Sequence, residues 1–99
     1  MPNSKLDFLN TLEDIILARQ SEPSTESYTS QLFAAGTQRI AQKVGEEAVE
    51  VALAACLQKR DETVNEAADL LYHLVVLLAD RNITLGEVVA TLQSRHATQ

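Results

Sequence analysis

Apolar residues recur every three or four positions along most of the chain, which is the spacing of one face of an α-helix. The clearest example is the run Leu6, Leu9, Leu12 and Ile16. Further helices are predicted over 29–35, 37–58, 61–80 and 84–95, with a polar loop at 21–27. No run alternates apolar and polar residues strictly enough to predict a strand. The pattern therefore predicts an all-α protein.

Capping residues indicate where several of these helices begin. In a capping box, two side chains three positions apart satisfy backbone N–H groups at the start of a helix. The pairs with this spacing are Ser4 with Asp7 and Thr84 with Glu87. Asp61 is the expected N-cap of the helix over 61–80. Gly36 either separates the second and third helices or kinks one continuous helix.

The helix over 62–80 has an unusually large apolar surface. Given 100° per residue, about half of its circumference is covered by Leu70, Leu71, Leu74, Val75, Leu77 and Leu78. The remaining stripe carries Glu62, Glu66, Asp69, Val76, His73 and Asp80. A solvent-facing helix would show a broader polar face with more Lys and Arg. We therefore expect an antiparallel helical bundle that is completed by dimerisation, so that the chain forms a homodimer or a higher homo-oligomer.

The composition fits one small helical domain. The 99 residues are 45% hydrophobic, contain no Trp and include only two Tyr and two Phe. We expect a single domain over 1–99, with the first and last few residues frayed. The formal charge of −6 and the isoelectric point near 4.7 argue against a nucleic-acid surface, which would need a basic stripe.

Cysteine usage and hydropathy bear on the compartment. Cys56 is the only cysteine, which excludes an internal disulfide and favours a reducing environment. We expect it to be a small buried apolar residue. The opening sequence MPNSKLDFLN lacks the basic and apolar segments of a signal peptide. The most apolar stretch, 70–79, is about half as long as a membrane span. We therefore expect a soluble cytoplasmic protein without a membrane partner.

Five carboxylates are concentrated on two of the predicted helices. They form the pattern E-E-x-x-E followed, after fifteen residues, by E-x-x-D, and they are Glu46, Glu47, Glu50, Glu66 and Asp69. These spacings place the side chains of each group on one helix face, so two antiparallel helices would direct them at one place. Leu53 and Leu57 continue the stripe into an apolar seam, where a solvated charge run is not expected.

Like charges held together in a partly buried place repel each other unless a cation neutralises them. A hard divalent cation is the usual partner of an all-oxygen cluster, and Mg²⁺ prefers carboxylates, water and phosphates. The spacing therefore predicts a metal site. The alternative interpretation is a solvated acidic face.

Two cations precede the acidic residues on the same helix face. Arg39 and Lys43 lie within about a 100° sector that also holds Glu46, Glu47 and Glu50. Lys43 precedes Glu47, and base before acid is the less favourable order for a stabilising pair. Arg39 in the first turn also opposes the helix dipole. We interpret this face as one that holds a metal at one end and anionic phosphates at the other.

His73 lies one turn after Asp69 on the acidic stripe. An imidazole there could hydrogen-bond a metal ligand, contact substrate or act as an acid. It could equally be a histidine in a polar network at the edge of the core. The E-x-x-H spacing of di-iron bundles is absent, which argues against a ferritin-like centre.

The acidic pattern on two helices resembles the all-α nucleoside triphosphate pyrophosphohydrolases of the MazG-like superfamily. Within this superfamily, two longer segments look like the phosphoribosyl-ATP pyrophosphohydrolase family of histidine biosynthesis: SYTSQLFAAGTQRIAQKVGEEAVEVALAA and NEAADLLYHLVVLLADRNITLGEV. The resemblance extends from about Leu6 to Arg95 and shows no departure at the acidic positions. The sequence as given has no segment like the cyclohydrolase domain of bifunctional members. The resemblance implies the MazG-like helical bundle as the fold.

The resemblance implies hydrolysis of phosphoribosyl-ATP to phosphoribosyl-AMP and pyrophosphate, with cleavage between the α and β phosphorus atoms. It assigns Mg²⁺ ligation to Glu47, Glu50, Glu66 and Asp69. We expect Glu46 to be an additional ligand or the base that orients the attacking water. The expected catalytic residues are therefore Glu46 and the metal ligand Glu47.

Substrate contacts are expected from cations and from the SYT segment. Lys43 and Arg39 are placed to contact triphosphate oxygens. Tyr28, Thr29 and His73 are the other expected substrate-binding residues; the SYT segment with Gly36 would approach the ribose phosphates. Ser27 and Thr29 could instead cap a helix.

Two other functions fit the pattern. The same site could serve a house-cleaning pyrophosphohydrolase that acts on ordinary or damaged nucleoside triphosphates. The chain could also be a non-catalytic helical dimerisation module whose acidic residues are only surface groups. A metal site would raise the melting temperature in the presence of Mg²⁺, and such a module would not.

Overall fold

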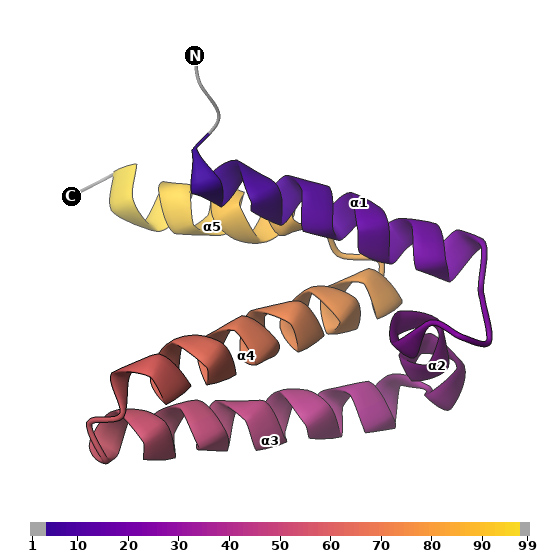
Figure 1. The fold of residues 1–99 in the computed structure, drawn as a ribbon. Coiled ribbons are helices and arrows are strands. Elements are labelled where there is room, and N and C mark those ends of the chain that lie inside the picture. Colours follow the sequence, from indigo (N-terminus) through magenta and orange to yellow (C-terminus); the bar gives the residue numbers. More distant parts are fainter. Residues whose placement is uncertain (1–3, 98–99) are drawn as a thin grey trace.

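The computed structural model describes residues 4–97, and within this range the chain is helical and contains no strand (Figure 1). The elements are the 3-10 turn η1 (Lys5–Asp7) and the helices α1 (Phe8–Ser21), α2 (Tyr28–Ala35), α3 (Thr37–Cys56), α4 (Arg60–Asp80) and α5 (Leu85–Ala97). The prediction of an all-α fold is therefore confirmed. The expected fraying of residues 1–3, 98 and 99 lies outside the described range.

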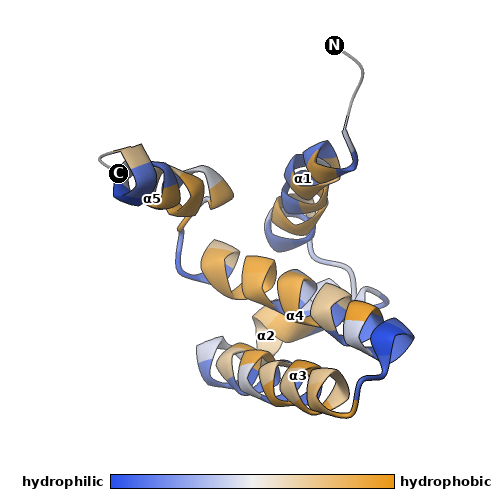
Figure 2. Ribbon diagram, turned by 90° about the vertical axis from the view of Figure 1, so that its left-hand side faces the viewer, coloured by the Kyte–Doolittle hydropathy of each residue, from blue (hydrophilic) through white to orange (hydrophobic). Residues whose placement is uncertain are grey.

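Helices α3 and α4 form an antiparallel pair that runs the length of the molecule (Figure 1). α1 crosses the side of α4 that faces away from α3, and the short α2 connects α1 to the start of α3. α5 overlaps α1 in Figure 1, but the turned view in Figure 2 shows the two helices apart. The longest packed surface is thus the α3–α4 pair, which carries both acidic motifs.

The core lies where α1, α2, the start of α3 and the second half of α4 meet. Its buried side chains are Ile16, Leu32, Ile40, Val75, Val76 and Ala79. Val76, which the helical spacing places on the polar stripe of α4, is fully buried, and His73 beside it is 5% exposed. This part of the stripe therefore faces the core, to which α1, α2 and α3 contribute Ile16, Leu32 and Ile40.

Gly36 separates α2 from α3, so the interpretation as one kinked helix is wrong. Its backbone has φ 98° and ψ 171°, a conformation in the region that L-residues rarely adopt. The chain can therefore change direction in a single residue. Ser27 caps α2 by accepting a hydrogen bond from the N–H of Ser30, while Thr29 does not serve as a cap.

The turn between α3 and α4 differs from the prediction. α3 ends at Cys56, because Gln58 adopts a left-handed conformation with φ 59°. The N–H of Lys59 then bonds to the carbonyl of Ala54, which closes the end of the helix as in a Schellman motif. Lys59 becomes the N-cap position of α4, and Asp61, the predicted N-cap, lies in the first turn instead.

The two predicted capping boxes are present. Ser4 and Asp7 form one at η1. Thr84 and Glu87 form the other, with the Thr84 N–H donating to Glu87 and the Glu87 N–H donating to Thr84. α5 continues to Ala97, two residues beyond the predicted fraying point.

Several large apolar side chains of α3, of the turn that follows it and of α4 are exposed in the single chain: Val49, Leu53, Leu57, Val64 and Leu71. Cys56 is also exposed, so the expectation of a buried cysteine is wrong; it occupies the last position of α3, beyond the packed part of the helix. No helix among the described residues is long and apolar enough to cross a membrane.

Candidate metal centre

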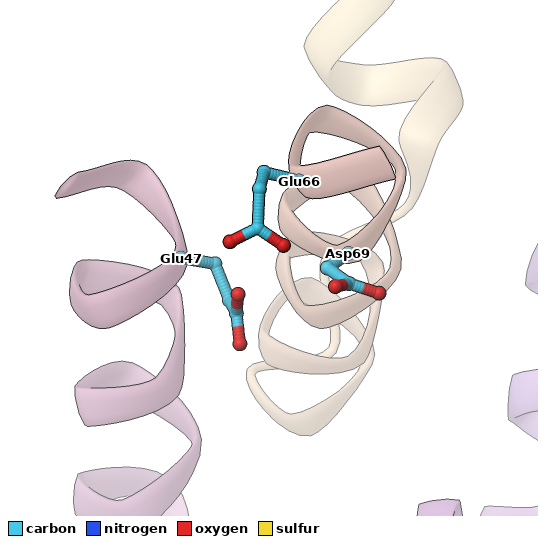
Figure 3. Close-up of side chains that lie close together, drawn as sticks. All are labelled: Glu47, Glu66 and Asp69. Carbon is cyan, nitrogen blue, oxygen red and sulfur yellow. The ribbon is translucent and has the colours of Figure 1, made fainter. Parts of the chain in front are cut away.

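Three carboxylates from two helices meet in the middle of the α3–α4 pair. Glu47 comes from α3, while Glu66 and Asp69 come from α4, and one oxygen from each lies within 4.8 Å of the others. Figure 3 shows Glu47 facing Glu66 and Asp69 across the space between the helices. The antiparallel packing inferred from the two acidic motifs therefore brings three of the five carboxylates together.

The fourth carboxylate, Glu50, adjoins this group through Glu66. A hydrogen bond shared with Glu50, partial burial and the negative charges of Glu50, Glu47 and Asp69 raise the pKa of Glu66 to about 7. A proton on one of these carboxylates relieves the repulsion, and a cation would relieve it in the same way. The cluster therefore carries a net negative charge that at least one further positive charge would be needed to neutralise.

Lys43 lies beside the cluster, one turn before Glu47. Its Nζ atom is 3.4 Å from Glu47 Oε2 and 3.7 Å from Glu46 Oε1. Burial lowers the pKa of Lys43, but the hydrogen bond to Glu47 and the charges of Tyr28, Glu47 and Glu46 outweigh it, so the pKa is raised. The ammonium group thus stays charged and holds the buried Glu47 in place.

Glu46 lies outside the group of three carboxylates. Its side chain is 49% exposed, pairs with Lys43 and accepts a hydrogen bond of 3.0 Å from the amide of Gln42. Arg39, one turn before Lys43, is exposed and forms no ion pair within residues 4–97. The predicted stripe is therefore divided: Lys43 and Glu47 adjoin the cluster, while Glu46 and Arg39 are at the solvent.

The donor set fits a hard divalent cation. All the candidate ligand atoms are carboxylate oxygens, and they come from Glu47, Glu66 and Asp69, with Glu50 adjacent. Mg²⁺ and similar cations bind through one or a few carboxylates and keep further positions for water and phosphate oxygens. No Cys or His joins this group among the described residues, which disfavours a softer metal.

A second group of side chains lies at the start of α2, one turn along α4 from Asp69. We call Lys43, Glu47, Glu66 and Asp69 the charged half of the site, and Tyr28, Thr29, Tyr72 and His73 the aromatic half. The hydroxyl of Tyr28 lies 2.9 Å from His73 Nε2, and the hydroxyl of Thr29 hydrogen-bonds to that of Tyr72. Burial raises the pKa of Tyr72, and its hydrogen bond with Thr29 acts in the opposite direction.

This arrangement bears on three of the five residues expected to bind substrate: Tyr28, Thr29 and His73. Thr29 is 8% exposed and His73 is 5% exposed, and the polar groups of both are engaged within the protein. Tyr28 is 48% exposed and remains accessible. The aromatic half therefore offers Tyr28 to a ligand and holds the other two behind it.

A groove extends from the cluster toward the α3–α4 turn. Its volume is about 380 Å³, and its walls combine carboxylates with apolar side chains: Glu50, Leu53, Ala54, Leu57, Glu62, Asn65 and Glu66. The acidic patch thus continues into Leu53 and Leu57, as their spacing predicts. Both leucines are exposed in the single chain, so the seam is open on this side.

Comparison with known families gives a match over most of the chain. The model of the family described as "Phosphoribosyl-ATP pyrophosphohydrolase" matches residues 9–96, a range that includes both acidic motifs and the aromatic half. The chain belongs to the phosphoribosyl-ATP pyrophosphohydrolase family. The resemblance seen in the acidic motifs and the two longer segments is therefore confirmed.

Curated relatives of the phosphoribosyl-ATP pyrophosphohydrolase family agree with this assignment. Each of the following is named histidine biosynthesis bifunctional protein HisIE. The Shewanella oneidensis protein is 53% identical over 90% of this chain and 42% of its own length. The Campylobacter jejuni protein is 52% identical over 95% and 45%, respectively, and the Escherichia coli K12 protein 53% identical over 90% and 44%. The chain spans somewhat less than half the length of these relatives.

Two side-chain contacts near the predicted site residues were not expected from the sequence. Gln42 holds Glu46, and its position four residues earlier on the same helix is a signal that could have been used. Tyr72 holds Thr29 across 43 positions of sequence. Nothing in the local spacing of either residue indicates this contact, because it depends on the turn at Gly36.

Proposed function

We propose that the chain catalyses the Mg²⁺-dependent hydrolysis of phosphoribosyl-ATP to phosphoribosyl-AMP and pyrophosphate, the second step of histidine biosynthesis. The observation that carries the proposal is the meeting of Glu47, Glu66 and Asp69 within 4.8 Å, from two helices, beside Lys43. The family membership over residues 9–96 supports the choice of substrate.

In this proposal Glu47, Glu66 and Asp69 hold Mg²⁺, and Glu50 is a further ligand beside Glu66. When bound, the ion supplies neutralising charge for the triphosphate and lowers the pKa of bound water. The carboxylates also direct the cation to one side of the α3–α4 pair, next to the open groove. The substrate can therefore enter without disturbing the core.

Glu46 is suited to the role of base that orients the attacking water. It lies outside the three-carboxylate group, next to Lys43, and its side chain is half exposed. A base should remain free of the metal so that it can accept a proton. Lys43 and the exposed Arg39 would hold the leaving pyrophosphate, because both can donate to phosphate oxygens and neutralise their charge.

The exposed Leu53, Leu57 and Leu71 are apolar surface that a second copy of the chain could bury, which supports a homodimer. We propose that residues 1–99 form one domain, that the reaction takes place in the cytoplasm and that no nucleic acid is bound. The activity of any larger protein that contains this chain, including a cyclohydrolase step, is likewise a proposal.

The test is release of pyrophosphate from phosphoribosyl-ATP, compared with release from a panel of nucleoside triphosphates. We expect phosphoribosyl-ATP to be the preferred substrate and a chelator to stop the reaction. Equal or better turnover of ordinary or damaged triphosphates would favour the house-cleaning function. Undiminished turnover in the presence of the chelator would contradict the metal dependence.

A matched pair of variants on α4 tests the site. Asp69→Asn removes a proposed ligand, whereas Asp61→Asn changes the same residue type on the same helix, at an exposed position outside the cluster. We expect Asp69→Asn to abolish most of the activity and Asp61→Asn to keep it. Similar activity in both variants would refute the assignment of the metal centre.

A further inference from the structure

His73 and Tyr28 form a hydrogen-bonded pair whose direction can be worked out. His73 Nδ1 lies 2.8 Å from the backbone carbonyl oxygen of Asp69, and a carbonyl oxygen can only accept. Nδ1 therefore carries the hydrogen. In the neutral ring Nε2 is then an acceptor, so the Tyr28 hydroxyl, 2.9 Å away, donates its hydrogen to it.

Tyr28 is held from behind by two rings. It meets His73 edge-on at a centroid distance of 5.8 Å and stacks on Tyr72 at 6.2 Å. The hydroxyl of Tyr72 is in turn bonded to Thr29, so the supporting ring is also fixed. Tyr28 itself is 48% exposed. Tyr28 is thus oriented by hydrogen-bond and ring contacts within the protein, while about half of its surface stays accessible to a ligand.

A tyrosine hydroxyl that has given its hydrogen to His73 has only lone pairs left for a ligand. Phosphate oxygens are also acceptors, so no hydrogen would lie between them and this oxygen. Sugar hydroxyl groups, by contrast, can donate. Lys43, which interacts electrostatically with Tyr28, can donate to phosphate instead.

We propose that His73 is a positioning residue that makes Tyr28 a hydrogen-bond acceptor for a sugar hydroxyl of the substrate. This inference rests on the proposed function, because it takes phosphoribosyl-ATP as the ligand. It departs from the expectation that the SYT segment approaches the phosphates. His73 is buried and both of its ring nitrogens are hydrogen-bonded within the protein, so it acts on the substrate only through Tyr28.

The first experiment separates sugar from phosphate recognition. Tyr28→Phe removes the acceptor and keeps the ring. We expect the KM for phosphoribosyl-ATP to rise about fivefold, as for loss of one hydrogen bond, with kcat within about twofold. The inhibition constant of pyrophosphate with Mg²⁺ should stay unchanged. An unchanged KM, or an equal rise in the inhibition constant, would overturn the inference.

The second experiment asks whether His73 acts through Tyr28. His73→Leu removes the acceptor nitrogen and should raise KM about as much as Tyr28→Phe, while the double variant should show no further rise. His73→Gln supplies an amide oxygen that can accept from Tyr28 and should restore most of the affinity. Additive effects of the two changes, or no rescue by Gln, would contradict the inference.

His96→Leu is the matched control for these variants. His96 makes the same kind of bond, from Nδ1 to the carbonyl of Leu92 at 2.8 Å, but it is exposed on α5. We expect the KM of the His96→Leu variant to match that of the unsubstituted protein.

A measurement on the unsubstituted protein needs neither a variant nor turnover. The ¹⁵N shifts of the His73 ring should report hydrogen on Nδ1 and none on Nε2. Hydrogen on Nε2 would overturn the inference. A protein that fails to turn over phosphoribosyl-ATP at all would remove the proposed function and with it the sugar contact. Normal turnover with unchanged KM in Tyr28→Phe removes only the inference.

Discussion

The charged and aromatic halves of the site lie one helical turn apart on α4 and differ in what the protein itself supplies. In the aromatic half, Tyr28 and Thr29 find hydrogen-bond partners in His73 and Tyr72. No buried side-chain nitrogen or oxygen in the described part of the chain lacks such a partner. In the charged half, the carboxylates outnumber the nearby cation, and the pKa of Glu66 is raised to about 7.

The difference separates polar groups that are paired within the protein from carboxylates whose charge the protein leaves largely unbalanced. A satisfied buried hydrogen bond stabilises the folded chain, and its removal leaves an unpaired group. Carboxylates that repel each other oppose folding until a cation arrives. Removing a buried hydrogen bond of the aromatic half, such as that between Thr29 and Tyr72, should therefore reduce stability, whereas changes in the charged half should reduce metal binding and activity.

The largest effect is expected from Glu47→Gln in the charged half. Loss of a proposed ligand next to the reacting phosphates should slow pyrophosphate release by roughly 100- to 1000-fold, while the metal-free protein stays folded.

Glu46→Gln should lower kcat but keep the stabilisation by Mg²⁺, because Glu46 lies outside the cluster. Initial rates and thermal unfolding would distinguish the two. Loss of the Mg²⁺ effect in Glu46→Gln would make Glu46 a ligand instead.

The next effect is the stabilisation by Mg²⁺ itself. At about 100 times its dissociation constant, a ligand of the folded state adds about 2.7 kcal/mol, which for a chain of this size raises the melting temperature by about 10 °C or more. Calorimetry with and without the ion would measure the shift. Glu66→Gln should lose most of it and Asp61→Asn should retain it. A chain indifferent to Mg²⁺ would fit the non-catalytic module.

A smaller effect is expected from Thr29→Val in the aromatic half. The change keeps the shape of the side chain but leaves the Tyr72 hydroxyl without its partner, which should cost about 1–2 kcal/mol of unfolding free energy. Thr91→Val is the control, since the Thr91 hydroxyl bonds to the carbonyl of Glu87 on the exposed face of α5. If urea unfolding shows equal losses of unfolding free energy in the two variants, the hydrogen bond between Thr29 and Tyr72 contributes no more than the exposed one of Thr91.

The smallest effect is the dependence of metal-free stability on pH. Because the folded pKa of Glu66 is raised from 4.5 to about 7, its contribution is fully present below pH 4.5 and is lost as the pH rises through about 7. The unsubstituted protein should therefore lose more stability between pH 5 and pH 8 than Glu66→Gln does. Parallel curves for the two proteins would show that Glu66 titrates normally.

Helices and their order could be predicted from the sequence because apolar spacing and capping boxes are local signals. The break at Gly36 was one of two alternatives, because a glycine allows either a break or a kink. The turn at Gln58 could not be predicted, since it depends on a left-handed backbone conformation. Gln58 carries no residue-type signal for such a conformation, unlike Asn82 at the end of α4. The helical spacing placed Val76 on the polar stripe of α4, but it is buried in the core with side chains from α1, α2 and α3.

The charged half was predictable because Glu47, Glu66 and Asp69 lie on two helices that are neighbours in sequence and space. Of the aromatic half, Tyr28, Thr29 and His73 were predicted one by one, without the contacts between them and without Tyr72. Tyr28 and His73 are 45 positions apart, and their meeting requires α2 to turn back toward α4. Helical periodicity describes one helix at a time and carries no information about such a meeting.

The turn at Gly36 has a consequence for the order in which the site assembles during folding. Contacts between segments close in the chain form before contacts that close a long loop. The α3–α4 hairpin should therefore gather the carboxylates early, and α2 should dock Tyr28 and Thr29 on α4 later. Pulsed hydrogen exchange during refolding should protect the amides of α3 and α4 before those of α2. On this account, the repelling carboxylates come together before the aromatic half has added its stabilisation.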